Sequence, residues 1–196
     1  MTNAPTQPRG DGRLVKTLVV VGLVALVVSL VIPSLNRRRE EKLAWLAQRA
    51  CPSTLGKIGM LALMYENEHG GAVPPDLDAL QRYAQKEFGG DISERFTCPY
   101  ARARGVAPKQ RGALCMSSFA YVVPAGVTHY SQIKQPGETV CAYEPLEDHD
   151  GLGTPVLYWD GHSTWYDAAE ARRIIDEVKA GRNPPGAGQR AGGGGR

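Results

Sequence analysis

The sequence lacks the short motifs by which many enzymes are recognised. It contains no glycine-rich phosphate loop, no dinucleotide-binding fingerprint and no motif for an activated nucleophile. None of its four cysteines belongs to a CxxC pair, the spacing in which zinc ligands usually occur. These absences argue against catalysis, and we expect a protein that is not an enzyme.

Positive charge is scarce in the central part of the chain. The 196 residues carry a net charge of +3, but residues 1–16, 36–50 and 182–196 together contribute +8. From Cys51 to Gly181 there are 12 Lys and Arg against 17 Asp and Glu, a net charge of −5. Because nucleic acids are bound by basic surfaces, we expect no nucleic-acid partner.

Charge is absent altogether from Thr17 to Leu35, nineteen residues that are mostly Val and Leu. At 1.5 Å per residue, a helix of this length spans about 28 Å, close to the hydrocarbon thickness of a bilayer. The alternative is the core helix of a soluble protein, but helices of soluble proteins leave a polar stripe, and this run has none. A signal peptide would need a cleavage site of small residues, whereas three arginines follow the run directly. We expect an uncleaved single-pass anchor in contact with membrane lipid, with these residues among its apolar positions: Leu18, Val21, Leu26, Leu30 and Pro33.

Two features of the sequence disagree about the orientation of this anchor. Three basic residues precede the run and five follow it within fifteen residues, so the positive-inside rule places the C-terminal part in the cytoplasm. Four cysteines without metal-site spacing are instead typical of two disulfides in an oxidising compartment. Four buried, reduced thiols are the alternative. We favour the disulfides and expect the globular region to lie outside the cytoplasm.

Helical patterns follow the anchor. Apolar residues at three- and four-residue spacings from Leu43 to Tyr65 predict a helix that Pro52 kinks or restarts. Gly70-Gly71 should end it. Two more helices are expected, at Asp76–Lys86 and at Asp167–Ala180, where Asp167 can act as the N-cap.

The second half of the globular region has the short apolar segments and turn residues that predict a small β-sheet. Asp160-Gly161 lies between two apolar segments and predicts a two-residue hairpin turn. Short strands are expected over four segments: Phe96–Cys98, Ser118–Val123, Thr139–Tyr143 and Val156–Trp159. The predicted fold class is therefore α+β, with a long N-terminal helix, a small antiparallel sheet and a C-terminal helix.

These patterns divide the chain into four parts. Residues 1–16 form a cytoplasmic N-terminal segment, residues 17–35 the transmembrane helix and residues 36–181 the α+β region. The last part, residues 182–196, is rich in Gly and Arg without apolar periodicity, and we expect it to be disordered.

The order of the motifs carries a family resemblance. The apolar run ends in Ile-Pro-Ser-Leu, and RRREEK and then CPSTLGKIGMLALMYENEHGGAVPPDLDAL follow. Four more segments come later: Phe96-Thr97-Cys98-Pro99, Ser118-Phe119-Ala120-Tyr121, Ala142-Tyr143-Glu144, and His149 ahead of Asp160-Gly161-His162. Over residues 14 to 168 this order resembles the pilin-like proteins of bacterial type II secretion and type IV pilus systems. It is most similar to the prepilin-type, H-x9-DG processing-associated subgroup.

The resemblance implies a pilin-like structural or assembly protein. Such a protein would be held in the bacterial cytoplasmic membrane, with similar pilin-like subunits or the secretion or pilus machinery as partners. One departure favours an alternative. Arg13-Leu14-Val15-Lys16 stands where related precursors have Phe-Thr-Leu-x-Glu, whose glutamate is thought to pair with a neighbouring subunit. The alternative is a monomeric, membrane-anchored domain that binds a ligand or partner outside the cytoplasm.

Four cysteines permit three disulfide pairings. The resemblance implies that Cys51 opens the helix that packs near Cys98, which favours that pair. Cys115 and Cys141 flank two candidate strands, and an antiparallel arrangement would bring those ends together. We therefore expect the pairs Cys51–Cys98 and Cys115–Cys141.

One polar cluster offers a candidate metal site. His149 and His162, with Asp150 or Asp160, have the ligand types that bind zinc, and the acidic run from Glu147 could bind calcium through oxygen atoms. Some pseudopilins carry calcium in a C-terminal loop. The alternative is that both Asp-Gly pairs form turns and both histidines are exposed. We favour turns, and expect no cofactor other than, at most, calcium.

Overall fold

The computed structural model describes residues 12–113 and 115–185. The chain divides into two compact units, Met1–Lys42 and Leu43–Arg196. We call the second unit the head.

The first unit consists of most of α1 (Gly12–Trp45), the helix predicted from the charge-free run. The large apolar side chains from Leu18 to Leu35 are 44–65 % exposed, and by length and composition this helix can cross a membrane. Ser29 and Ser34 donate their hydroxyl hydrogens to the backbone oxygens of Leu26 and Val31. Both serine hydroxyl groups are therefore satisfied within the helix, which suits an apolar environment.

A π-helical turn, η1 (Leu46–Ala50), separates α1 from α2 (Cys51–Glu68). Pro52 lies in the first turn of α2 and has no backbone N–H to donate to the preceding turn, which accounts for the irregular turn just before it. The hydroxyl of Thr54 donates to the carbonyl oxygen of Ala50. The helix ends at Glu68, and Gly70 follows with φ of 64°, so the predicted restart and end are both confirmed.

The head contains a four-stranded antiparallel sheet in the order β3 (Ala120–Tyr121), β4 (Val140–Tyr143), β5 (Gly153–Tyr158) and β6 (Ser163–Asp167). A second pair joins β1 (Lys109–Gln110) to β2 (Met116–Ser117). The predicted α+β class is confirmed. The hairpin from β5 to β6 has three residues between Tyr158 and His162, one more than predicted, with Gly161 at φ of 89°.

The two further helices that the sequence predicts are both present, α3 against α2 and α5 against the sheet. The side chain of Asp76 accepts a hydrogen bond from the backbone N–H of Ala79 and caps α3 (Leu77–Phe88). Asp167 caps α5 (Ala168–Lys179) in the same way, through the N–H groups of Ala169 and Glu170. The remaining short helices are η2 (Ser93–Phe96), α4 (Pro99–Ala103), η3 (Tyr130–Gln132) and η4 (Leu146–His149).

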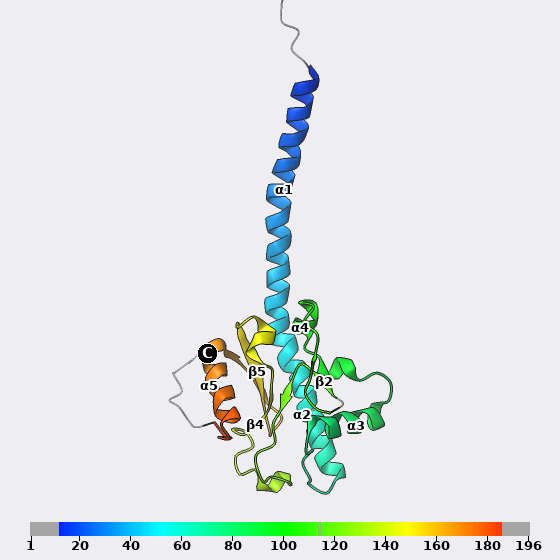
Figure 1. The fold of residues 1–196 in the computed structure, drawn as a ribbon, viewed down its shortest axis with the longest axis vertical. Helices are drawn as coiled ribbons and strands as arrows, with labels where there is room; N and C mark the ends of the chain where they lie inside the picture. Colours follow the sequence, from blue (N-terminus) through cyan, green and yellow to red (C-terminus); the bar gives the residue numbers. More distant parts are fainter. Residues whose placement is uncertain (1–11, 114, 186–196) are drawn as a thin grey trace, which may run out of the picture. The chain divides into compact units, whose positions relative to one another are not determined.

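The sheet is covered on both faces, with α2 and α5 on opposite sides (Figure 1). Along β5, Leu157 packs in the cluster that contains α2, whereas Val156 and Tyr158 pack with the apolar face of α5. This alternation is the period of two that a strand imposes. All six residues of β5 are buried, in keeping with its apolar second half from Pro155 to Tyr158.

One predicted strand is absent. Phe96–Cys98 is not a strand: η2 ends at Phe96, and the carbonyl oxygen of that buried residue accepts hydrogen bonds from Ser117 Oγ and the N–H of Ser118. The C-terminal segment is held in place at Asn183, whose side-chain amide donates to the carbonyl oxygen of Val140 and accepts from its N–H, both at 2.8 Å. Residues 186–196 lie outside the described part of the chain.

Candidate functional site

Four buried polar side chains meet inside the head: Cys51, Cys98, Glu144 and His149. We call them the Cys–His–Glu cluster. Each offers one metal-ligating atom, and these atoms all lie within 4.8 Å of one another. None of the four side chains has any exposed surface. Four ligand-type groups so close together in the interior are the feature of this structure with the most distinctive chemistry.

The members come from four separate segments. Cys51 is the first residue of α2, and Cys98 is the N-cap of α4, held there by a hydrogen bond from its backbone N–H to Ser118 Oγ. Glu144 directly follows β4, and His149 ends η4, the short helix that connects β4 to β5. The cluster therefore forms only when the helix, the α4 loop and the sheet are assembled.

The imidazole of His149 is at the centre of the polar contacts. Its Nε2 atom lies 3.3 Å from Cys98 Sγ and 3.1 Å from Glu144 Oε2. Its Nδ1 atom lies 3.1 Å from the carbonyl oxygen of Gly153. Since a carbonyl oxygen can only accept, Nδ1 carries a hydrogen, and Nε2 is the atom that faces the thiol and the carboxylate.

Burial and mutual contacts shift the pKa values of His149 and Cys98. Burial lowers the pKa of His149, but the contacts with Cys98 and Glu144 outweigh it and raise that pKa to about 10. Burial also raises the pKa of the Cys98 thiol well above its ordinary range. The contacts of His149 thus favour the protonated imidazole, and burial favours the neutral Cys98 thiol.

Aromatic rings enclose the imidazole. The ring of Tyr100 meets His149 edge-on at 4.9 Å, and that of Trp165 lies 5.3 Å away. The hydroxyl of Tyr100 donates to Asp150 Oδ2, which also pairs with Arg104 at 2.9 Å. Packing and a polar clamp therefore hold the histidine in one orientation.

The structure does not bring together the four predicted metal ligands His149, Asp150, Asp160 and His162. Only His149 belongs to the cluster, and Asp150 is paired with Arg104. Asp160 and His162 pair with each other on the β5–β6 hairpin, where both side chains are partly exposed. The four residues do not meet at one point, because β5 separates His149 and Asp150 from Asp160 and His162.

The acidic run that suggested calcium is neutralised by basic side chains. Asp148 is 4 % exposed and pairs with Lys109 at 2.9 Å and with Arg111 at 3.7 Å. Glu147 lies 3.7 Å from the same lysine. Basic partners at this distance take the places that a calcium ion would need.

All four cysteines are buried free thiols, so neither predicted disulfide is present in the structure. Cys51 and Cys98 are nevertheless close, as members of the same cluster. Cys115 and Cys141 lie in the apolar core, where burial raises both of their pKa values, to about 11 for Cys115. For Cys115 and Cys141, the structure therefore agrees with the alternative of buried, reduced thiols that pack like small apolar residues.

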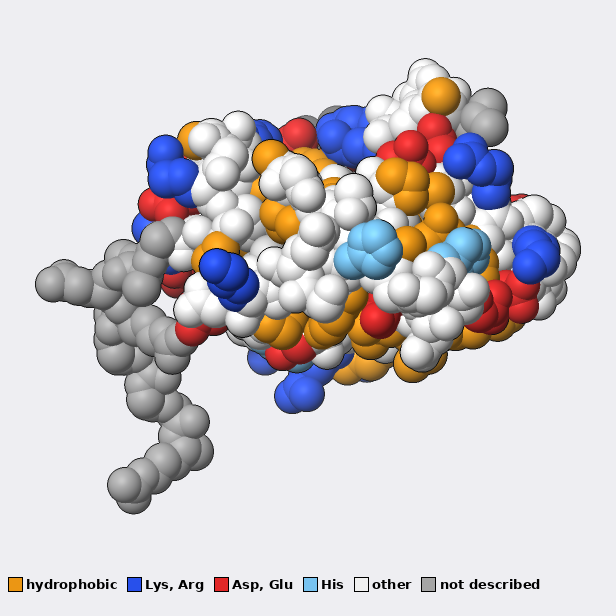
Figure 2. Space-filling model, turned by 90° about the horizontal axis from the view of Figure 1, so that it is seen from below, with side chains coloured by type: hydrophobic (Ala, Val, Ile, Leu, Met, Phe, Trp, Pro, Cys, Tyr) orange, Lys and Arg blue, Asp and Glu red, His pale blue; other side chains and the backbone are white. Residues whose placement is uncertain are grey.

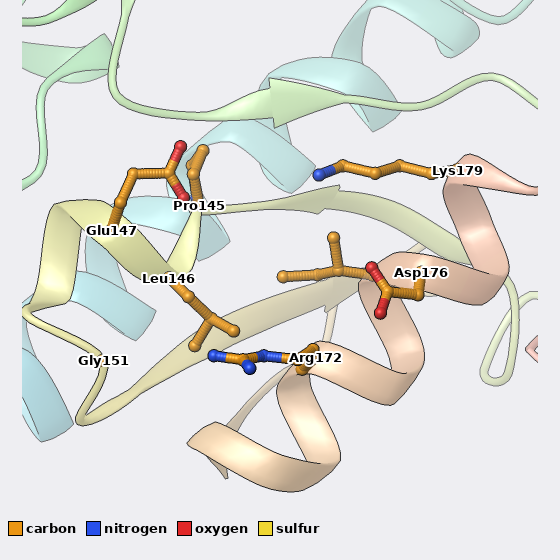
Figure 3. A pocket seen from close by; sticks show the side chains of 8 residues that line it. Pro145, Leu146, Glu147, Gly151, Arg172, Asp176 and Lys179 are labelled. Carbon is orange, nitrogen blue, oxygen red and sulfur yellow. The ribbon is translucent and has the colours of Figure 1, made fainter.

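A cleft of about 340 Å³ opens between η4 and α5. In Figure 3, Leu146 and Arg172 extend toward each other across it, with Asp176 and Lys179 on the α5 side and Glu147 on the η4 side. The view in Figure 2 likewise shows acidic and basic side chains interspersed around the rim of the head, not a field of one sign. The face seen in Figure 2 thus carries charges of both signs.

In comparisons with known proteins, no family model, curated protein or solved structure matches this chain. Sequence reasoning paired Cys51 with Cys98 and singled out His149 as a metal ligand, but it did not group the three residues. Glu144 was noticed only as part of a motif, and no spacing signal links it to Cys51, 93 residues earlier in the chain.

Proposed function

We propose that this protein is a membrane-anchored, pilin-like structural or assembly protein of a type II secretion or type IV pilus-like system. In this proposal α1 lies in the bacterial cytoplasmic membrane and the head lies outside the cytoplasm. The observation that carries the proposal is the exposure of α1. Its apolar side chains from Leu18 to Leu35 have no protein partner within the described part of the chain.

The physical argument is the cost of leaving this surface in water. Burying apolar surface is worth about 25 cal/mol per Å², and each Val or Leu side chain contributes about 1.5–3 kcal/mol when fully buried. Thirteen large apolar side chains between Leu18 and Leu35 are exposed. Lipid, or similar helices of other subunits within lipid, would cover all of them.

The head supports the pilin-like part of the proposal. Its first helix, α2, packs on one face of a small antiparallel sheet and contacts β5 and β6. Gly59 allows this close approach, because a Cβ atom there would lie 2.9 Å from Leu157 Cδ1. Together with the motif order of the sequence, an apolar N-terminal helix followed by a helix on an antiparallel sheet favours a pilin-like protein.

A second candidate function rests on two observations. Lys16 occupies the region where the related proteins have the glutamate used in assembly, and the cleft between η4 and α5 offers both signs of charge. These features favour a monomeric, membrane-anchored domain that binds a ligand or partner outside the cytoplasm. Both candidates require the anchor and differ in whether α1 contacts other subunits.

Photocrosslinking in the membrane distinguishes them. A photoreactive amino acid at Val24, which is 57 % exposed on α1, should give adducts with a second chain or with another subunit that has an apolar N-terminal helix. The matched control is Leu152, equally exposed but in the head. Dilution in detergent before irradiation should abolish the Val24 adducts.

Membrane-bound protein that gives no Val24 adducts would favour the monomeric domain. Recovery of the full chain in a soluble fraction would contradict both candidates, because each depends on the anchor.

A further inference from the structure

We propose that Cys51, Cys98, Glu144 and His149 bind one Zn²⁺ ion as a closed structural site that joins α2, the α4 loop and the sheet. The inference rests on the cluster alone and does not depend on the proposed function. Of its four residues, only His149 is among the metal ligands that the sequence suggested.

The ligand set suits zinc. Thiolate sulfur, imidazole nitrogen and carboxylate oxygen are its usual protein ligands, with bonds of about 2.0–2.3 Å. In a tetrahedral site such bonds place the ligand atoms about 3.3–3.8 Å apart. The cluster has Nε2–Sγ and Nε2–Oε2 distances of 3.3 and 3.1 Å, and no pair exceeds 4.8 Å, so small side-chain movements suffice.

The histidine is oriented as zinc ligands commonly are. Its Nδ1–H donates to the carbonyl oxygen of Gly153, so that Nε2 faces Cys98 and Glu144 and can bind a metal ion once it gives up its proton. Metal-bound histidines usually donate their second ring nitrogen to such an acceptor, which fixes the tautomer and the ring plane. The rings of Tyr100 and Trp165 hold the same orientation by packing.

Glu144 is the independent observation that points to a cation. It is completely buried, its carboxylate is directed into the cluster, and neither oxygen accepts a well-aligned hydrogen bond. A buried carboxylate with only one ionic neighbour is expensive. A cation bonded to it, to Nε2 and to both sulfurs would satisfy every polar group in the cluster.

A Cys51–Cys98 disulfide satisfies the cluster less well. It would use both sulfur atoms and leave Glu144 and His149 as an isolated buried pair. Zinc binding instead releases the thiol protons of both cysteines, and the Nε2 proton of His149, to solvent. The resulting site has a net charge of −1, the same as zinc bound by three cysteines and one histidine.

Full burial makes the site structural. With no exposed ligand surface there is no open coordination position for water or a substrate, the feature that distinguishes catalytic zinc sites. The ion would join segments up to 98 positions apart, from Cys51 to His149. Because such a site forms only in the folded chain, its binding energy adds to the stability of the head.

The test uses the full chain in detergent, with an affinity tag that contains no histidine. Metal content is measured by mass spectrometry after purification under reducing conditions, and the stripped protein is titrated with Zn²⁺ and with Co²⁺. We expect one Zn²⁺ per chain, a melting temperature that rises on adding zinc, and the visible bands of tetrahedral Co²⁺ with thiolate charge transfer.

Single substitutions locate the ion. Cys98→Ser and Glu144→Gln should weaken zinc binding, the first by at least about 100-fold. The matched control is Cys141→Ser, which alters another fully buried cysteine outside the cluster and should keep one Zn²⁺ per chain. If a variant fails to fold, the proposal is still tested by two measurements on the unaltered chain, its cobalt spectrum and the dependence of its melting temperature on zinc.

Three results would overturn the proposal. They are an unaltered chain with no zinc and no zinc-dependent melting temperature, a Cys98→Ser variant that keeps its zinc affinity, and a Cys51–Cys98 disulfide in protein taken from its own membrane.

Discussion

Glu144 Oε2 lies 3.1 Å from His149 Nε2, and neither side chain has any exposed surface. Glu144 precedes η4 and His149 is its last residue, so both belong to the connection between β4 and β5. A sheet connection thus places a carboxylate and an imidazole in contact inside the head, beside the thiol of Cys98.

Replacing Glu144 with Ala should strongly destabilise the metal-free head. The substitution leaves the imidazole of His149 buried without its anionic neighbour, and losing one partner of a buried pair costs about 3–5 kcal/mol. Urea unfolding in the presence of a chelator measures the change. The control is Glu147→Ala, whose side chain is 67 % exposed and should cost less than about 1 kcal/mol. Equal effects for the two variants would contradict this account of the pair.

Gly59→Ala should destabilise the head more than Gly56→Ala does. A Cβ atom at position 59 would lie 2.9 Å from Leu157 Cδ1 in the core, whereas at position 56 the nearest atom is Ser163 Oγ at 4.0 Å. Both substitutions gain helix propensity, so the difference between their unfolding free energies measures the effect of the close approach of α2 to β5. We expect this difference to be about 1–2 kcal/mol. Denaturant unfolding of the two variants side by side tests it. The interpretation fails if Gly59→Ala is as stable as its partner.

Asn183→Ala should release the chain that follows α5. The substitution removes two hydrogen bonds to the backbone of Val140 and should cost about 1–3 kcal/mol. Hydrogen exchange at the Val140 amide should become faster. Arg182→Ala, which alters a 62 % exposed neighbour, is the control and should leave that amide protected. Unchanged protection in Asn183→Ala would be inconsistent with the anchoring seen here.

The head should lose stability as the pH rises through the alkaline range, in part because of Cys115. Burial raises the pKa of this thiol from 9.0 to about 11, with the charge of Asp78 as a smaller cause. The folded state therefore favours the neutral thiol. The corresponding stability is fully present below about pH 9, and it is lost as the pH rises through about 11.

The Cys115 contribution amounts to at most about 2–3 kcal/mol. It is measured as the difference in alkaline slope of the unfolding free energy between the unaltered chain and Cys115→Ala. Identical slopes would show that this thiol does not contribute.

Local chemistry made much of the fold predictable from the sequence. Asp76 and Gly89 mark the two ends of α3, and Asp167 marks the start of α5, because capping groups act on neighbouring backbone atoms. The charge-free run predicted the apolar part of α1, because a continuous apolar stretch of this length can be recognised in the sequence itself. The short strand pair β1–β2 and helix α4 were missed, because each has too few residues for a periodic pattern.

The Cys–His–Glu cluster could not be predicted in this way. Cys51 and Glu144 belong to different elements, and only the packing of α2 against the sheet brings them together. Sequence proximity instead grouped His149 with Asp150 and His162. The side chain of Asp150 is held by Tyr100 and Arg104, and His162 belongs to the far end of β5.

Fractionation of cells that produce the full chain tests the central claim of membrane anchoring most directly. The account predicts that the protein sediments with membranes, stays there after alkaline carbonate extraction, and is released only by detergent. Full-length protein in the soluble fraction without detergent would contradict it.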